Sequence, residues 1–152
     1  MSNTVSISEL KAGLKPRQRL LGMDPGSKTI GLALSDLTLT IATPLEIIRR
    51  KRFKDDVARI KEIVEKENVG GFVIGWPVNM DGSLGPRCQS VTAFSNNLAE
   101  HFDLPQTLWD ERLSTAAVER TLLEADSSRA RRKEVVDKMA AAYILQGALH
   151  AL

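Results

Sequence analysis

Carboxylates at the ends of short apolar runs are the side chains in this sequence best suited to chemistry. Asp24 ends one such run, Asp110 and Glu111 end another, and Asp137 stands in a C-terminal segment with helical spacing. The carboxyl ends of strands in an α/β sheet gather at one edge, so these acids can meet. Grouped carboxylates raise one another's pKa unless a hard cation neutralises them. Two such ions, Mg²⁺ or Mn²⁺ about 3.5–4 Å apart, can activate water and stabilise the leaving oxygen in phosphodiester cleavage.

Each acid also has a simpler interpretation. Asp24 is followed by Pro and Gly, a sequence that could serve only to shape a turn. Asp110 and Glu111 could pair with Arg112 at a strand end, and Asp137 could be a solvated helix position paired with a neighbouring lysine. Local sequence leaves both interpretations open.

Basic residues near these acids are candidates for contacts with phosphate. Lys28 stands at the tip of the turn that follows Asp24, and Arg131 and Arg132 lead into the last helix, near Asp137. A further basic run, residues 49–54, is either solvated surface or another phosphate contact. Such contacts give affinity for a polyanion without sequence specificity.

The elements that would position these residues follow from apolar periodicity and turn residues. Three close-set strands predict an antiparallel meander, and two later strands that alternate with helices predict parallel additions to it. We therefore expect an α/β domain with a mixed five-stranded sheet and helices on both faces, over residues 18–152, preceded by a flexible extension at residues 1–17. The expected strands are 20–24, 30–35, one within 39–48, 71–75 and 107–109, and the expected helices are 53–67, 86–100, 114–123 and 131–152.

Composition excludes several classes of protein. The chain has 152 residues, of which 43% are hydrophobic, and this length and composition fit one globular domain. Its net charge of +2 hints only weakly at a polyanionic partner. One cysteine, Cys88, cannot form an intrachain disulfide and is expected to pack in the core, and two histidines make a zinc site improbable. With no signal-peptide pattern and no apolar stretch of about 20 residues, a cytoplasmic protein without a membrane span is expected.

Four ordered motifs together resemble the YqgF family of pre-16S rRNA nucleases, also described as Holliday-junction-resolvase-like. The match runs from about residue 19 to the C-terminus. The motifs are LGMDPG at 21–26 with Gly31, VIGWP at 73–77 with DGS at 81–83, WDERLST at 109–115 with Ala117, and VDKMAA at 136–141 with Ile144 and Leu145. The resemblance implies a ribonuclease H-like fold, divalent-metal nuclease chemistry and trimming of the 5′ end of precursor 16S rRNA. Cleavage of branched DNA is the related alternative.

The resemblance also implies roles for individual acids. Asp24 matches the first-strand metal ligand of the superfamily, and Asp137 matches the carboxylate of the final helix. Junction resolvases carry a Glu at the end of the fourth strand, where this chain has Gly75. The middle acid is therefore expected after the fifth strand, with Glu111 favoured over Asp110.

Residues 75–85 would then form a flexible flap facing the substrate. Asn79 and Ser83 are its candidate phosphate donors, alongside Lys28, Arg112 and the pair Arg131 and Arg132. The expected partner is RNA, and the chain would act as a monomer or a homodimer.

The expected mechanism is in-line attack of a metal-activated water on phosphorus. Asp24 would hold both ions, while Asp137 and Glu111, or Asp110, would complete one site each. Two rivals remain open on the sequence. Asp-x-Gly-x-x-x-x-Gly at 24–31 also occurs in actin-like kinases, which need two such domains, and the domain could be a non-catalytic rRNA-binding assembly factor.

Overall fold

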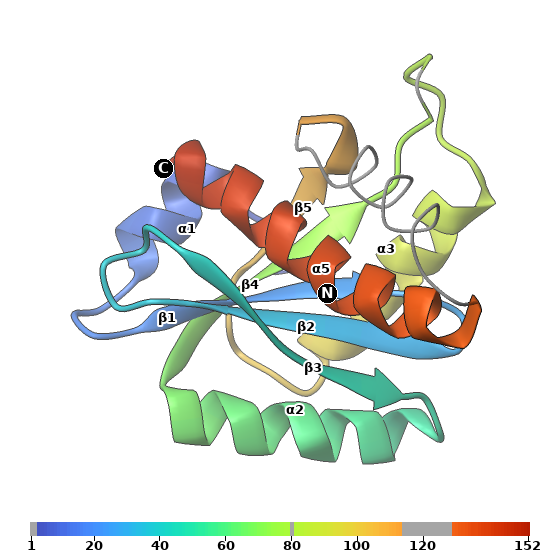
Figure 1. Cartoon of the computed structure of the whole chain (residues 1–152). Helices are drawn as coiled ribbons and strands as arrows, with labels where there is room; N and C mark the ends of the chain where they lie inside the picture. Colours follow the sequence, from blue (N-terminus) through green and yellow to red (C-terminus); the bar gives the residue numbers. More distant parts are fainter. Residues whose placement is uncertain (1–2, 80, 114–128) are drawn as a thin grey trace.

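The structure is a computed structural model that describes residues 3–79, 81–113 and 129–152, with the backbone alone for residues 113 and 129–138. Its elements run from a short N-terminal helix through three consecutive strands into alternating helices and strands (Figure 1). In chain order they are α1 (Ile7–Gly13), β1 (Arg19–Pro25), β2 (Thr29–Ser35), β3 (Ala42–Arg49), α2 (Phe53–Glu67), β4 (Val69–Trp76), α3 (Pro86–Ala99), β5 (Gln106–Asp110), the 3-10 turn η1 (Glu111–Leu113) and α5 (Arg129–His150).

One five-stranded sheet of order β3-β2-β1-β4-β5 organises the molecule. β1 pairs antiparallel with β2, and β2 with β3, whereas β1–β4 and β4–β5 are parallel pairs. This is the mixed sheet that the sequence predicted. Because β1, β4 and β5 are parallel, their carboxyl ends lie at the same edge of the sheet, where the acids of β1 and β5 are found.

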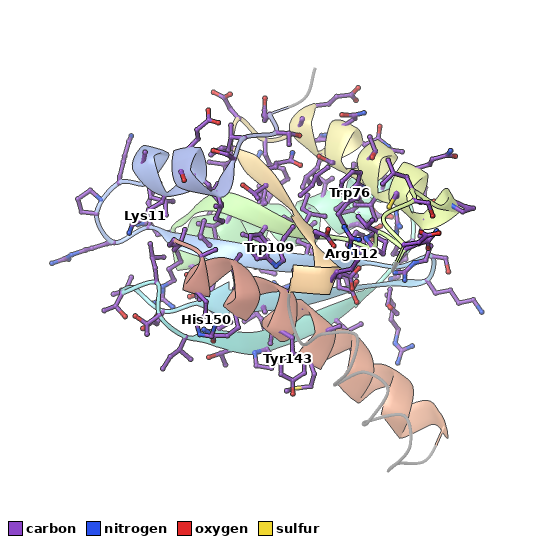
Figure 2. The ribbon with its side chains drawn as sticks, turned by 90° about the horizontal axis from the view of Figure 1, so that it is seen from above. Lys11, Trp76, Trp109, Arg112, Tyr143 and His150 are labelled. Atoms are coloured by element: carbon purple, nitrogen blue, oxygen red, sulfur yellow. The ribbon has the colours of Figure 1, made fainter. Side chains whose placement is uncertain are left out.

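Helices α1 and α5 cover one face of the sheet. The core on this face is built from small and aliphatic side chains, and it includes Ala33, Val73, Ala141, Leu145 and Ala148, all fully buried. Seen from above, α5 with Tyr143 and His150 lies over the strands, with Trp109 of β5 beside it (Figure 2). Small residues on both partners let the helix approach the sheet closely.

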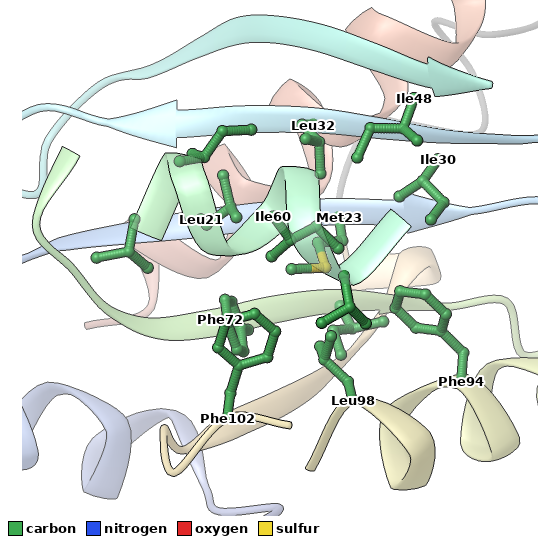
Figure 3. Close-up of a cluster of buried hydrophobic side chains, with 14 of the residues drawn as sticks. Leu21, Met23, Ile30, Leu32, Ile48, Ile60, Phe72, Phe94, Leu98 and Phe102 are labelled. Atoms are coloured by element: carbon green, nitrogen blue, oxygen red, sulfur yellow. The ribbon is translucent and has the colours of Figure 1, made fainter. Parts of the chain in front are cut away.

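Helices α2 and α3 cover the opposite face with larger side chains. Its buried cluster contains Leu, Ile and Met residues of β1 and β2 together with aromatic rings (Figure 3). Phe72 and Phe102 meet edge to face with ring centroids 5.4 Å apart, and Phe53 and Phe94 do so at 5.9 Å. All four phenylalanines of the chain belong to this cluster or pack against it.

The beginning of the chain packs against the sheet, whereas the sequence suggested a flexible extension. Ser6 and Glu9 form a capping box that starts α1, and Leu10 is fully buried in the α5-side cluster. The backbone of Val5 donates to Gln106 O at 2.7 Å, which adds a short parallel bridge beside β5. The segment differs from the expectation because its sparse apolar residues find a surface that exists only after β5 and α5 have assembled. A domain boundary after residue 17 stays a prediction.

The remaining elements follow the sequence closely. Helix α2 has the predicted bounds and ends at Asn68, whose left-handed backbone (φ 52°) caps it. Strand β4 is longer than the predicted 71–75, and β5 is longer than 107–109, because pairing in the sheet continues past the apolar residues. The predicted helix at 114–123 lies outside the described residues. No helix in the described part of the chain is both long and apolar enough to span a membrane.

Candidate active site

Asp24 is buried near the carboxyl end of β1, with 8% of its surface exposed. Side chains alternate along a strand, so Asp24 and Gly22 face the same side. That side is covered by α5, because a Cβ on Gly22 would lie 2.8 Å from Leu145 Cβ and 3.1 Å from Ala141 O. Asp24 therefore lies on the α5 face of the sheet, two residues after Gly22, where α5 closely approaches β1.

Glu111 brings a second buried carboxylate to the same face. It opens η1 directly after β5 and is 7% exposed. A Cβ on Gly75 would lie 3.6 Å from the Glu111 carboxyl carbon and 2.5 Å from Ile144 Cδ1 of α5. In the parallel register of β1 and β4, Met23 pairs with Ile74, which puts Gly75 level with Asp24. The Glu111 carboxylate thus lies over the end of β4, beside the strand that carries Asp24.

Asp110 is engaged differently. Both of its carboxylate oxygens accept from Arg112, with Nη2–Oδ2 at 2.8 Å and Nε–Oδ2 at 3.1 Å, and the Arg112 backbone N donates to Oδ1 at 2.9 Å. The hydrogen bond from Arg112 lowers the pKa of Asp110, and Asp110 raises that of Arg112. Trp76 and Arg112 lie at the end of the sheet where β4 and β5 finish (Figure 2). The two neighbouring acids therefore differ in their surroundings. Asp110 pairs with Arg112, whereas the Glu111 carboxylate lies over the end of β4 on the α5 face.

The loop between β4 and α3 is closed by its own hydrogen bonds. Asn79 Nδ2 donates to Ser83 Oγ at 3.0 Å, and Ser83 Oγ donates to Asp81 Oδ1 at 2.6 Å. These bonds from Ser83 lower the pKa of Asp81, and the nearby charge of Arg112 adds to the effect. Gly82 adopts φ 90°, a conformation that favours glycine. Asn79 and Ser83 were predicted as phosphate donors. In the structure, their side chains form hydrogen bonds within the loop, to each other and to Asp81.

The remaining predicted site residues are placed less fully. Lys28 is exposed at the turn between β1 and β2. Asp137, Arg131 and Arg132 lie within α5, and their side chains are outside the described part of the structure. Among the described residues, no group of three His, Cys, Asp or Glu side chains could hold a metal ion.

Two glycines were missed as determinants of this site. No role for Gly22 was predicted from the sequence, and Gly75 was notable only for standing where junction resolvases carry a Glu. The structure shows that both let α5 approach the sheet, and that Gly75 leaves room for Glu111. The available signal was a glycine inside each of two apolar strands, which often marks a close approach.

Comparisons with known proteins agree with the motifs. The sequence profile of the RuvX family, described as Holliday junction resolvase, matches residues 18–151. A protein of Paramagnetospirillum magneticum named "Putative pre-16S rRNA nuclease" is 65% identical over 142 residues, covering 93% of this chain and 92% of its own length. A protein of the same name from Roseobacter denitrificans is 56% identical over 144 residues, with 93% and 88% covered.

The fold has solved relatives as well. The structure described as T. thermophilus RuvC in complex with Holliday junction substrate is similar with a TM-score of 0.53 and 16% identity, over 88% of this chain and 94% of that one. At this identity the likeness establishes the RuvC-like, ribonuclease H-like fold. With the profile match and the sequence relatives, it shows that this chain belongs to the RuvX family, the YqgF family that its four motifs resemble.

Proposed function

We propose that this protein is a metal-dependent nuclease that hydrolyses phosphodiester bonds in RNA, and that it processes the 5′ end of precursor 16S rRNA. The observation that carries the proposal is the pair of buried carboxylates, Asp24 and Glu111, on one face of the sheet at the carboxyl edge. Membership of the RuvX family and relatives named as pre-16S rRNA nucleases support the enzyme class.

The donor set fits a hard divalent cation. Two buried carboxylates, one near the end of β1 and one over the end of β4, repel each other and are costly to desolvate, and a bound cation offsets both costs. Oxygen ligands of this kind suit Mg²⁺ or Mn²⁺. Gly75 has no side chain and so leaves the space in which the Glu111 carboxylate lies. A carboxylate that binds a metal ion needs such space around it.

Asp137 is the proposed third ligand. It lies four residues before Ala141, about one helical turn, and Ala141 is the residue of α5 whose backbone oxygen approaches Gly22. Gly22 is two residues before Asp24 in the same strand. The helix therefore reaches β1 close to the first acid, which favours Asp137 as its partner.

Divalent ions at this site would supply an activated water and stabilise charge on the leaving oxygen. Asp24, Glu111 and Asp137 would hold them. Asp110 would act as a positioning residue by keeping Arg112 in place through its two-oxygen contact. Lys28, Arg131 and Arg132 would orient phosphates of the bound strand.

The substrate is proposed as RNA because the similar full-length relatives carry the rRNA nuclease name. The family description names Holliday junctions, so branched DNA is the second substrate to test. Action in the cytoplasm and a monomeric or homodimeric state stay predictions.

The test is cleavage of a labelled RNA spanning the precursor 16S 5′ end, alongside a four-way DNA junction. Wild type, Asp24→Asn and the exposed-acid control Asp103→Asn would be assayed with Mg²⁺, with Mn²⁺ and with EDTA. We expect RNA cleavage that needs metal, is lost in Asp24→Asn and is retained in Asp103→Asn. Cleavage of the DNA junction without cleavage of the RNA would show that the substrate is branched DNA.

A binding role gives a different result. A non-catalytic RNA-binding factor would bind the RNA tightly and cleave neither substrate under any of the metal conditions. A metal-induced rise in melting temperature in wild type, absent in Asp24→Asn, would show that the acids hold metal even before a substrate has been found.

A further inference from the structure

A small basic cavity lies next to the proposed site, on the opposite side of β1. Its volume is about 270 Å³, and we call it the arginine pocket; it is lined by Pro25, Gly26, Ser27, Arg50, Arg87 and Ser90. Two of its six lining residues are arginines, two are serines and none is acidic. We propose that the arginine pocket binds a backbone phosphate of the nucleic-acid strand, flanking the bond that is cleaved. The strand assignment rests on the proposed function.

Arg50 is held in place before any ligand arrives. Its Nη1 donates to Gly26 O at 2.8 Å, and its Nε lies 3.8 Å from Oδ2 of the buried Asp56. The guanidinium carbon is 5.6 Å from the centroid of the Phe94 ring. Since a guanidinium has five N–H donors and one is used by Gly26, this anchoring leaves donors for an anion and lowers the entropic cost of binding it.

Arg87 has a different status. It lies in the first turn of α3, is exposed, and forms no ion pair with the described acids. That turn contains no acidic residue, and the N-cap Gly85 provides no side-chain cap. The positive end of the α3 dipole therefore adds to the charge of the two arginines.

The position of the pocket explains why a nucleic-acid strand is the favoured occupant. Pro25 lines the pocket and is the residue after Asp24, so the pocket begins one residue from the proposed reaction centre. Adjacent strand residues face opposite sides, which puts the pocket on the α3 side and Asp24 on the α5 side. A strand crossing this edge of the sheet could present one phosphate to the acids and another to the arginines.

Other basic residues extend the same surface. The backbone N of Arg50 donates to Lys28 O at 2.8 Å, which brings the end of β3 beside the turn after β1. Arg50 and Lys28, separate in sequence, thereby lie at the same edge of the sheet. A volume of about 270 Å³ is below the range of about 300–1,000 Å³ typical of small-molecule sites, which favours a phosphate group over a whole free nucleotide.

The primary test is binding of a fluorescein-labelled single-stranded RNA, followed by anisotropy in EDTA over a series of salt concentrations. Arg87→Gln should weaken binding about tenfold at low salt, as loss of a charge-assisted phosphate contact predicts. The slope of log affinity against log salt should fall by about 0.7. Arg52→Gln is the matched control, because Arg52 is exposed in the same basic region but outside the pocket, and it should change affinity less than about twofold.

A second pair of variants tests the cavity itself. Ser90 is exposed on α3, so Ser90→Asp and Ser90→Asn should both fold, which melting curves would verify. Ser90→Asp should weaken RNA binding more than Ser90→Asn. Equal effects of the two variants, or Arg87→Gln no weaker than Arg52→Gln, would overturn the proposal.

Neutral methylphosphonate linkages, placed one at a time along the RNA, locate the phosphate. One linkage should weaken binding to wild type while having little further effect on Arg87→Gln. Weakening spread evenly over all linkages would indicate diffuse attraction and contradict a built pocket. Inorganic phosphate that binds to the pocket without weakening RNA binding would also contradict it, since the pocket would then hold a free anion and not a phosphate of the RNA.

These readings are independent of catalysis because EDTA removes the metal. A nuclease unaffected by Arg87→Gln would refute the pocket and leave the enzyme intact. An Arg87-dependent binding protein without cleavage would refute the enzyme and leave the pocket.

Discussion

At the carboxyl edge of β1 and β4, the face covered by α5 differs from the face covered by α2 and α3. On the α5 side, Gly22 and Gly75 let the helix approach, and the side chains near the edge are the carboxylates of Asp24 and Glu111. On the other side, aromatic and aliphatic residues fill the space, and the edge carries Arg50 and Arg87. The acids Asp24 and Glu111 and the arginine pocket therefore lie on opposite faces of the same sheet, at the same edge.

The difference shows how two consecutive residues of one strand can contribute to two different sites, one on each face of the sheet. Asp24 faces one side, and Pro25 lines the cavity on the other. Like charges repel within either site, and the sheet places the acids and the arginines on opposite faces. Four predictions test this separation.

The largest effect is expected from the buried acids. Glu111→Gln and Asp24→Asn should each lower metal-dependent cleavage about 10³-fold, because loss of a metal ligand costs about 4 kcal/mol of transition-state stabilisation. Asp110→Asn should lower metal-dependent cleavage by no more than about tenfold, since Asp110 acts through Arg112. Single-turnover rates measure this, with circular dichroism to verify folding. If Asp110→Asn matches Asp24→Asn and Glu111→Gln does not, the two acids have been assigned in the wrong order.

The next effect concerns the close approach of α5. Gly22→Ala should lower the free energy of unfolding by about 1–3 kcal/mol, because the new methyl would lie 2.8 Å from Leu145 Cβ and 3.1 Å from the Ala141 backbone oxygen. Urea unfolding measures this loss. Gly13→Ala is the control, since nothing lies within 4 Å of a Cβ at Gly13. Equal stability of the two variants would mean that α5 does not need the glycine.

Gly75→Ala should affect catalysis more than stability. The new methyl meets the flexible end of Ile144, which can shift, but it also reaches 3.6 Å from the Glu111 carboxyl carbon. A displaced carboxylate should cost about tenfold in kcat, or about 1.4 kcal/mol, with little change in the urea midpoint. A variant with unchanged kcat would show that Glu111 does not depend on the space above Gly75.

The smallest effect is a pH dependence at the exposed ion pair. Arg112 lowers the pKa of Asp110 below its ordinary value of 3.8, so the pair stabilises the fold above that value and its contribution is lost as the pH falls through the lowered pKa. The pair is partly exposed to solvent, so its contribution to stability is small. Urea unfolding should show a gap between wild type and Asp110→Asn at pH 7 that narrows below about pH 4. Asp103→Asn should show no such gap, and a gap independent of pH would assign the loss to packing.

Much of the fold could be predicted from the sequence because its signals are local. The helix at Phe53–Glu67 has apolar residues at helical spacing, acids in its first turn and a capping Asn68, all within 16 residues of one another, and its bounds were confirmed. Apolar runs ending in turn residues likewise predicted the strands and the mixed sheet. The N-terminal segment differed because Leu10 is buried by elements about a hundred residues away.

The sequence by itself determined the order of elements, the class of fold, the family and the set of acids available at the sheet edge. Only the tertiary structure decided which of the adjacent Asp110 and Glu111 is buried over β4 and which holds Arg112, because a turn of one residue reverses a side chain's direction. The arginine pocket is likewise a product of folding. Arg50 and Arg87 are 37 positions apart in the sequence, and only the packing of α3 against the sheet brings them to one cavity beside Asp24.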